Sequence, residues 1–346
     1  MLRYRFAFII PLLIFVSIFC GCSGKNNDKH TAVRPGQKAF GKNNYFFFVG
    51  NVNKNPGLYK YTFDKKESVK FWSNRNEKVI ELSYSADGRF AFFLTAEKIG
   101  KLGIFSYLNN VKLYLLNAGS AEVSFIKTIG SGLQVFTSWE SNSTFKIILN
   151  YPDKSVVSYV NQKTEFYNIF GKELVSETKT YDITKDGYPK PSLKMNMNFS
   201  FDDKYKIFYS DSAKEISIIQ LATEKKIFSF NTGQSLKRAA WTKDGDFLVF
   251  STLDILQSNS TLYSENAETS KIFIYSTRKA KVVKEWAGSG VKDFLIINNY
   301  LIFDDGFQNN SSIKIVEIKS QNNFDTIKIN GGCGIRNIPQ VPDYSS

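Results

Sequence analysis

An all-β fold is predicted for most of this sequence by its aromatic content, by a recurring turn pattern and by its short apolar runs. The 346 residues include 31 Phe and 18 Tyr but only 3 Met and 8 Pro. Aromatic and β-branched side chains favour strands over helices, and so much ring surface argues against a disordered chain. The length alone allows either several domains or one large β domain.

One pattern recurs along the chain. It consists of an aromatic residue, a polar turn rich in Asp, Asn and Gly, a second aromatic six positions later and a short apolar strand. Such turns suit β-hairpins because Gly, Asn and Asp tolerate the required backbone angles. The pairs are Phe40/Phe46, Tyr84/Phe90, Trp139/Phe145, Phe199/Tyr205, Trp241/Phe247 and Phe294/Tyr300.

The spacing of these pairs predicts the architecture. Their first members lie 42 to 60 residues apart, and most hairpins precede two more strand-like runs. Examples of these runs are 112–116 with 122–128, 215–221 with 226–231, and 271–276 with 281–286. Four strands and forty-odd residues per unit are typical of a β-propeller blade, so six copies predict a six-bladed propeller of four-stranded antiparallel blades. The alternative for any one pair is an ordinary hairpin in a β-sandwich.

Two of the copies resemble a known repeat. Residues 85–92 (SADGRFAF) and 241–250 (WTKDGDFLVF) resemble the blade repeat S-P-D-G-K-x-hydrophobic-A-F of TolB-like and WD40-like propellers. Neither copy has the proline of that repeat, and the other four copies lack Asp-Gly. The resemblance implies a propeller over residues 38–346.

The N-terminus carries the pattern of an export signal. Two arginines precede an apolar run over residues 6–19, which is too short to span a bilayer as a helix. Gly21 and Cys22 follow, and this junction resembles the signal of a bacterial lipoprotein, in which a small residue precedes the cysteine that is acylated. Phe19 and Cys20 depart from the residues usual in that family. Ordinary cleavage after Gly24, which would give a secreted soluble protein, is the alternative.

The lipoprotein resemblance implies how the chain is organised and located. Residues 1–21 would be the signal peptide, Cys22 would carry palmitate or similar acyl chains, and residues 22–37 would be a flexible tether. The protein would be lipid-anchored in the bacterial cell envelope, and Ser23 after the cysteine favours the outer membrane. Cys333 would then be the remaining thiol, either buried and inert or reactive.

Composition narrows the classes of function. The single histidine, His30, precedes the predicted domain, which argues against a histidine base or a multi-histidine metal site there. The net charge of +13 comes from scattered lysines, which indicate a solvated surface or an anionic partner such as lipid headgroups or acidic polysaccharide. Export from the cytoplasm argues against nucleic acid as a binding partner.

No catalytic motif, phosphate-binding glycine loop or paired-cysteine metal motif is present in the sequence. We therefore expect no catalytic residue, metal ligand or cofactor to be identifiable, and a monomer that acts as a non-catalytic binding platform for an envelope protein or polymer partner. The alternative function is a propeller hydrolase or lactonase, whose channel metal would be held by Asp, Asn and Glu from different blades.

Three long connections are predicted on one face of the propeller: 96–111, 174–193 and 253–270. Long connections without regular structure are often functional or merely disordered, and their shared face favours partner binding. The candidate partner-binding residues are Lys98, Lys101, Phe105, Tyr107, Tyr181, Lys185, Tyr188, Lys190 and Tyr263.

Overall fold

The computed structural model describes residues 44–85, 88–102, 105–141, 143–187, 189, 200, 204–210, 212–254, 269–288, 294–305 and 311–329. All of them belong to the second of two compact units, Phe40–Ser346. The regular structure within these ranges consists of strands, which confirms the all-β prediction. The predicted signal peptide and tether, with Cys22, lie outside the described residues, as does Cys333.

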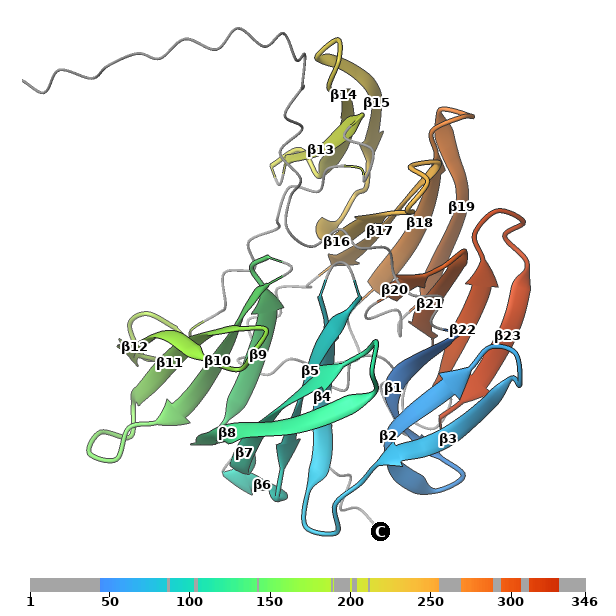
Figure 1. The fold of residues 1–346 in the computed structure, drawn as a ribbon. Coiled ribbons are helices and arrows are strands. Elements are labelled where there is room, and N and C mark those ends of the chain that lie inside the picture. Colours follow the sequence, from blue (N-terminus) through green and yellow to red (C-terminus); the bar gives the residue numbers. More distant parts are fainter. Residues whose placement is uncertain are drawn as a thin grey trace, which may run out of the picture. The chain divides into compact units, whose positions relative to one another are not determined.

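The strands form six antiparallel sheets, numbered here in chain order (Figure 1). Sheet 1 contains β1 (Tyr45–Val52), β2 (Asn55–Thr62) and β3 (Glu67–Trp72), and sheet 2 contains β4 (Lys78–Tyr84), β5 (Phe90–Ala96), β6 (Lys98–Leu102), β7 (Phe105–Asn117) and β8 (Glu122–Gly132). Sheet 3 contains β9 (Gln134–Trp139), β10 (Thr144–Pro152), β11 (Tyr159–Asn168) and β12 (Glu173–Asp182).

The second half of the chain repeats this arrangement. Sheet 4 contains β13 (Tyr205–Ser210), β14 (Glu215–Gln220) and β15 (Lys225–Asn231), and sheet 5 contains β16 (Ser235–Trp241), β17 (Phe247–Asp254), β18 (Thr269–Ser276) and β19 (Lys281–Gly288). Sheet 6 contains β20 (Phe294–Ile297), β21 (Tyr300–Asp305), β22 (Ser312–Glu317) and β23 (Asn323–Lys328). In sheets 3, 5 and 6, four consecutive strands pair in sequence order, as predicted for a repeated unit.

The predicted turn motif joins the first two strands of sheets 2 and 5. In sheet 5, Trp241 ends β16 and Phe247 begins β17, and the Thr242 hydroxyl accepts a hydrogen bond of 3.0 Å from the N–H of Phe247. In sheet 2, the hydroxyl of Ser85 accepts the corresponding bond of 3.1 Å from Phe90. The hydroxyl therefore closes the turn, and Gly245 at φ 70° supplies the left-handed conformation that it needs.

The sixth copy of the motif differs from the prediction. Phe294 begins β20 instead of ending it, and the strand turns at Asn298-Asn299 directly into Tyr300 of β21. Asn298 has φ 54°, a conformation that asparagine tolerates in tight hairpins. The six-residue spacing of Phe294 and Tyr300 thus spans a whole short strand, and this pair is not equivalent to the others.

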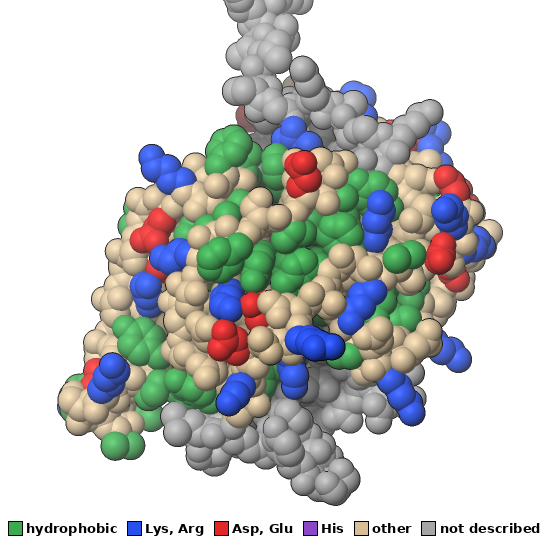
Figure 2. Space-filling model, turned by 60° about the horizontal axis from the view of Figure 1, so that its bottom comes forward, with side chains coloured by type: hydrophobic (Ala, Val, Ile, Leu, Met, Phe, Trp, Pro, Cys, Tyr) green, Lys and Arg blue, Asp and Glu red, His purple; other side chains and the backbone are tan. Residues whose placement is uncertain are grey.

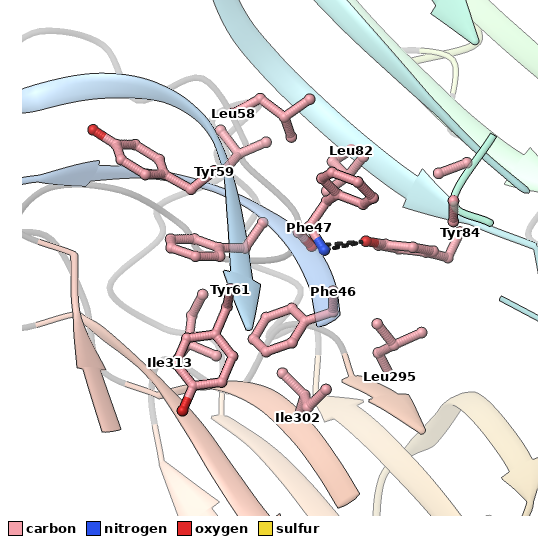
Figure 3. Packing of buried hydrophobic residues seen from close by; sticks show 14 of the residues in the cluster. Phe46, Phe47, Leu58, Tyr59, Tyr61, Leu82, Tyr84, Leu295, Ile302 and Ile313 are labelled. Carbon is pink, nitrogen blue, oxygen red and sulfur yellow. Dashed lines mark hydrogen bonds between the residues drawn. The ribbon is translucent and has the colours of Figure 1, made fainter. Parts of the chain in front are cut away.

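Neighbouring sheets are held together by apolar clusters. The largest joins β1 and β2 to β4 of sheet 2 and to sheet 6, and Figure 3 shows Phe46, Phe47 and Tyr61 at its centre with Leu82 and Ile302 around them. Other clusters join sheet 2 to sheet 3, sheet 4 to sheet 5, and sheet 5 to sheet 6. Strands buried on both faces explain the consecutive apolar residues in the sequence.

The first and last sheets of the chain pack against each other. Phe63 stacks on Tyr300 with ring centroids 4.8 Å apart, and the Tyr61 hydroxyl donates a 2.6 Å hydrogen bond to Asp325. The backbone N–H of Asn51 donates to the carbonyl of Ile329 at 3.1 Å. Residues almost three hundred positions apart in the sequence therefore form one core.

Candidate functional site

The first predicted loop is a β-hairpin and not an irregular connection. Lys98 pairs with Asn109, and the pairing continues to Leu102 and Phe105 in the same register that joins β5 to β7. Strands β5 and β6 thus form one long arm that is interrupted only at Glu97. The prediction of an irregular connection over 96–111 was wrong because Leu108 is buried in the core between sheets 2 and 3, which fixes the hairpin to the sheet.

An ion-pair network around the buried Glu77 holds the base of this hairpin. Lys112 lies 2.9 Å from a carboxylate oxygen of Glu77 and 3.0 Å from one of Glu97. Glu77 also accepts hydrogen bonds from Thr95 at 2.8 Å and Tyr114 at 2.9 Å. Burial would raise the pKa of Glu77, but the bonds from Lys112, Thr95 and Tyr114 outweigh it and lower that pKa. These bonds also keep Glu77 charged, so the network fixes the hairpin and leaves no free base.

The hairpin base is hydrogen-bonded to β8 of its own sheet, and the residue that follows β8 is hydrogen-bonded to sheet 3. The Ser131 hydroxyl accepts a 2.9 Å bond from the N–H of Asn110, and the N–H of Leu133 donates to the carbonyl of Asn150 in β10 at 2.7 Å. The buried amide of Asn150 in turn donates to the carbonyl of Pro189 at 3.4 Å. The structure therefore brings the first predicted loop to the same end of the molecule as part of the second.

The turn between β10 and β11 also lies at this end, and Asp153 organises it. One carboxylate oxygen of Asp153 accepts bonds from the N–H groups of Ser155 at 2.8 Å and Val156 at 3.2 Å, and the other accepts from Asn161 at 2.9 Å. The hydroxyl of Ser155 donates to it as well, and these bonds hold the pKa of Asp153 well below its usual range. The turn is therefore pre-organised before any partner arrives.

The tip of this turn is apolar. Val157 is 99% exposed and Val156 is 39% exposed, and Lys154 beside them is also exposed. Asp153 fixes the backbone of this turn at Ser155 and Val156, and β-branched side chains have few rotamers, so the two valines stay directed into solvent. They form a small apolar contact point in solvent.

The turn after β12 adjoins this tip. The N–H of Ile183 donates to the carbonyl of Ser158 at 2.9 Å. Asp182 accepts bonds from the hydroxyl of Thr184 at 2.7 Å and from its N–H at 3.1 Å, which lower the pKa of Asp182. Lys185 lies 3.6 Å from Asp182 but remains largely exposed, so its charge faces solvent.

We call these three segments together the loop surface: the β6–β7 hairpin, the turn over 153–158 and the turn over 182–187. Its exposed side chains include Val157 at the apolar tip and the lysines Lys98, Lys154 and Lys185, which are spread over the three segments. On the face in Figure 2, Lys and Arg side chains are scattered and do not gather into one patch, which agrees with the solvated surface expected from their spread in the sequence.

The structure places some of the predicted partner-binding residues on the loop surface, and others lie outside the described residues. Lys98 and Tyr107 lie on the β6–β7 hairpin, with Tyr107 half-buried opposite Gly100, and Lys101 and Phe105 lie near its turn. Tyr181 is half-buried near the end of β12, and Lys185 is on the following turn. Tyr188, Lys190 and Tyr263 lie outside the described residues, so the third loop, 253–270, is described only at its ends.

The second predicted loop, 174–193, begins as a regular strand. Its first part pairs with β11 along β12 up to Asp182. The prediction of an irregular connection there was wrong because both faces of β12 are exposed, so the sequence lacks the alternation of apolar residues that marks a half-buried strand.

The sequence reasoning missed the turn over 153–158. Its signal is local: Asp153 and Ser155 are turn formers, and two valines follow them before the next strand. The turn is short, whereas the predicted partner-binding residues lie on long connections only. Glu77 was also missed, because its partner Lys112 lies 35 residues away in the sequence.

In the part of the chain that the structure describes, no group of three or more His, Cys, Asp or Glu residues could hold a metal ion. The same part contains no helix with the length and apolar character needed to cross a bilayer.

No protein-family model matches the sequence, and no curated protein matches it. Solved structures are similar in fold. A putative 6-phosphogluconolactonase from Bacteroides fragilis is 12% identical with a TM-score of 0.42, over 84% of this chain and 97% of that one.

Two further structures are similar at the same level. Apo AztD from Citrobacter koseri is 9% identical with a TM-score of 0.38, over 85% of this chain and 98% of its own. The Cps50 (Swd1) β-propeller domain from Myceliophteria thermophila is 11% identical with a TM-score of 0.32, over 84% and 85%. Likeness this distant says nothing about the activity of the present chain.

Proposed function

We propose that this chain is a lipid-anchored protein of the bacterial cell envelope whose six sheets form a β-propeller, and that the propeller is a non-catalytic platform for an envelope protein or polymer. The succession of six antiparallel sheets along the chain supports the propeller. So does the packing of the first sheet on the last, since a linear stack of sheets would leave these two apart.

The observation that carries the platform role is the apolar tip of the loop surface. Val157 is held in solvent by a turn whose backbone is fixed through Asp153, so its exposure is built in and does not come from a loose loop. A pre-organised contact point loses little conformational entropy when a partner binds. Binding therefore suits this turn better than a purely structural role does.

The exposed lysines of the loop surface indicate the chemistry of the partner. Lys154, Lys185 and Lys98 are exposed on the three segments of the loop surface. A partner with an apolar contact beside anionic groups would complement both features. Each exposed ion pair contributes little, so the lysines would mainly orient the partner and speed its association.

The test is a capture experiment with the full chain from its own envelope extract. The double variant Val156→Asp, Val157→Asp places charge on the tip and leaves the bonds to Asp153 in place, so we expect the captured partner to be lost. Phe170→Asp is the matched control, because Phe170 is 80% exposed on the turn at the opposite end of sheet 3. An unchanged partner profile in the double variant would refute the platform at this surface.

The anchor is tested separately. We expect metabolic labelling with a palmitate analogue to label the chain, and Cys22→Ser to abolish the label while Cys20→Ser keeps it. Because Cys22 and Cys20 differ by two positions only, this pair also distinguishes a lipobox from ordinary cleavage after Gly24. Label that persists in Cys22→Ser would contradict the assignment.

A further inference from the structure

Strand β12, the outer edge of sheet 3, is open to solvent on both faces. Residues 172–180 are all exposed, and no other strand with described side chains has so long an exposed run. From Val175 to Asp182 the strand is nevertheless regular, because it pairs with β11 there in one register; the register shifts only at Leu174, outside that stretch. Its composition, ELVSETKTYD, contains no proline that would block the addition of another strand.

The free hydrogen-bonding groups of β12 follow from its pairing. The N–H of Ile183 donates to the carbonyl of Ser158, which continues the register of Tyr159 with Asp182. In an antiparallel ladder the groups of alternate residues point to opposite sides. The odd-numbered residues of β12 therefore bond to β11, and the even-numbered residues from Ser176 to Thr180 direct their N–H and C=O groups outward.

We propose that β12 pairs with β12 of a second copy of this chain, antiparallel and centred on Thr178. A two-fold axis at Thr178 places Ser176 opposite Thr180 of the other copy, and all of these are residues whose backbone groups point outward. The same register places Glu177 opposite Lys179 and Val175 opposite Tyr181. Two-fold symmetry repeats each of these pairs.

The side chains complement one another in this register. The pairs of Glu177 with Lys179 and of Val175 with Tyr181 fall at non-hydrogen-bonded positions, where cross-strand side chains lie closest. Opposite charges and aromatic with β-branched neighbours both stabilise such positions. If the sum of paired positions changed by one, each residue whose N–H and C=O point outward would lie opposite a residue whose N–H and C=O bond to β11, so the backbone alone excludes that register.

Other sheet edges are less suited to self-pairing. β15 begins with two adjacent lysines, Lys225 and Lys226, which oppose addition of a strand with the same charge. β8 is distorted at several points where its register with β7 shifts. Compared with β8 and β15, β12 combines a long exposed run, a regular stretch from Val175 to Asp182 and self-complementary charge.

The test is the oligomeric state of the full chain by sedimentation velocity over a range of concentrations. We expect a reversible dimer. Glu177→Lys alone and Lys179→Glu alone each create two like-charged pairs across the axis and should weaken the dimer at least about tenfold. The double variant Glu177→Lys, Lys179→Glu exchanges the charges and should restore it, which general effects on folding or solubility would not do.

A cross-link fixes the register. Thr178→Cys should form a disulfide between copies under mild oxidation, because the two-fold axis brings both residues to one hydrogen-bonded pair at about 5.5 Å between Cα atoms. Ser176→Cys is the control, and it should form no more disulfide-linked dimer than the parent chain does. A monomer at every concentration, which is the state expected from the sequence, or a dimer unaffected by the single charge variants, would overturn the proposal.

Discussion

The hydroxyl of Tyr84 in sheet 2 is hydrogen-bonded to the backbone of Phe47 in sheet 1 (Figure 3). Removal of this hydroxyl should destabilise the domain strongly. The hydroxyl accepts a 2.8 Å bond from the N–H of Phe47 and donates a 2.8 Å bond to the carbonyl of the same residue. Tyr84 is 4% exposed and Phe47 is fully buried. Burial raises the pKa of Tyr84, so the hydroxyl stays protonated and able to donate.

The cost follows from what Tyr84→Phe leaves behind. The phenylalanine keeps the ring and its packing, but the N–H and the C=O of Phe47 lose their partner in a site that water does not reach. A stranded buried polar group costs about 1–3 kcal/mol, so two of them give about 3 kcal/mol of lost unfolding free energy. That is a large share of the stability of an ordinary domain.

Urea unfolding followed by tryptophan fluorescence measures this loss, with an unchanged slope as the sign that the unfolded state is the same. Tyr45→Phe is the matched control. It removes another hydroxyl that links sheet 1 to sheet 2, a 2.9 Å bond to the carbonyl of Gly119, but at an exposed position where water can replace it. We expect a loss below about 1 kcal/mol there. Equal losses for the two variants would refute the argument from burial.

Three further outcomes are expected. Burial raises the pKa of Glu165, but bonds from Lys163, Tyr167 and Lys127 outweigh it and lower that pKa in the folded protein. A lowered pKa gives stability that is lost as the pH falls below about 4.3, the unfolded pKa of Glu. Glu165→Gln should therefore flatten this loss of unfolding free energy, measured by urea titrations at several pH values. Thr95→Val should cost more unfolding free energy than Thr252→Val, because Thr95 donates to the carboxylate of Glu77 whereas Thr252 donates to an amide. Thermal melts with excess Ca²⁺ and with chelator should coincide, and a clear rise in melting temperature with Ca²⁺ would favour the metal-dependent hydrolase.

The parts of the fold that were predictable rest on local chemistry. The hairpin at Trp241 was predicted from its aromatic pair and its Asp-Gly turn, and the structure shows that Thr242, Asp244 and Gly245 close this turn among themselves. The failure at Phe294 has the opposite cause. An aromatic spacing without that chemistry fits a short strand as well as a turn, so the spacing alone could not place the residue.

The candidate site was less predictable, because its parts meet only through the fold. Neither the buried Asn150 nor the Ser131 hydroxyl marks a site in the sequence, yet Ser131 binds the backbone at the hairpin base and Asn150 binds the backbone of the second predicted loop. The exposure of Val157 could not be predicted either, since valine in a β-rich sequence is ordinarily assigned to a strand. Sequence patterns report the partners of a residue only when those partners are near in the chain.

Sheets 2 and 5 share a relationship that the aromatic pattern does not reveal. Glu77 and Gln234 each lie one residue before the first strand of their sheet, and each accepts a hydrogen bond from a threonine, Thr95 or Thr252, on the second strand. In both first strands the pairing register shifts a few residues later, between Val79 and Glu81 in β4 and between Leu236 and Arg238 in β16. The geometry is therefore repeated down to single bonds.

The charge at this shared position differs, since Glu77 is an acid and Gln234 is neutral, and the lysine near each of them has a different partner. Each threonine faces a lysine on the third strand, Thr95 facing Lys112 and Thr252 facing Lys271. Lys112 pairs with the carboxylate of Glu77, but Gln234 offers no charge, and Lys271 pairs instead with Glu285 on the outer strand. A buried charge must be compensated where it lies, whereas a neutral amide frees the lysine to turn outward. The two sheets are thus one structural unit in a charged and a neutral form, and the charged form stands at the base of the hairpin that contributes to the loop surface.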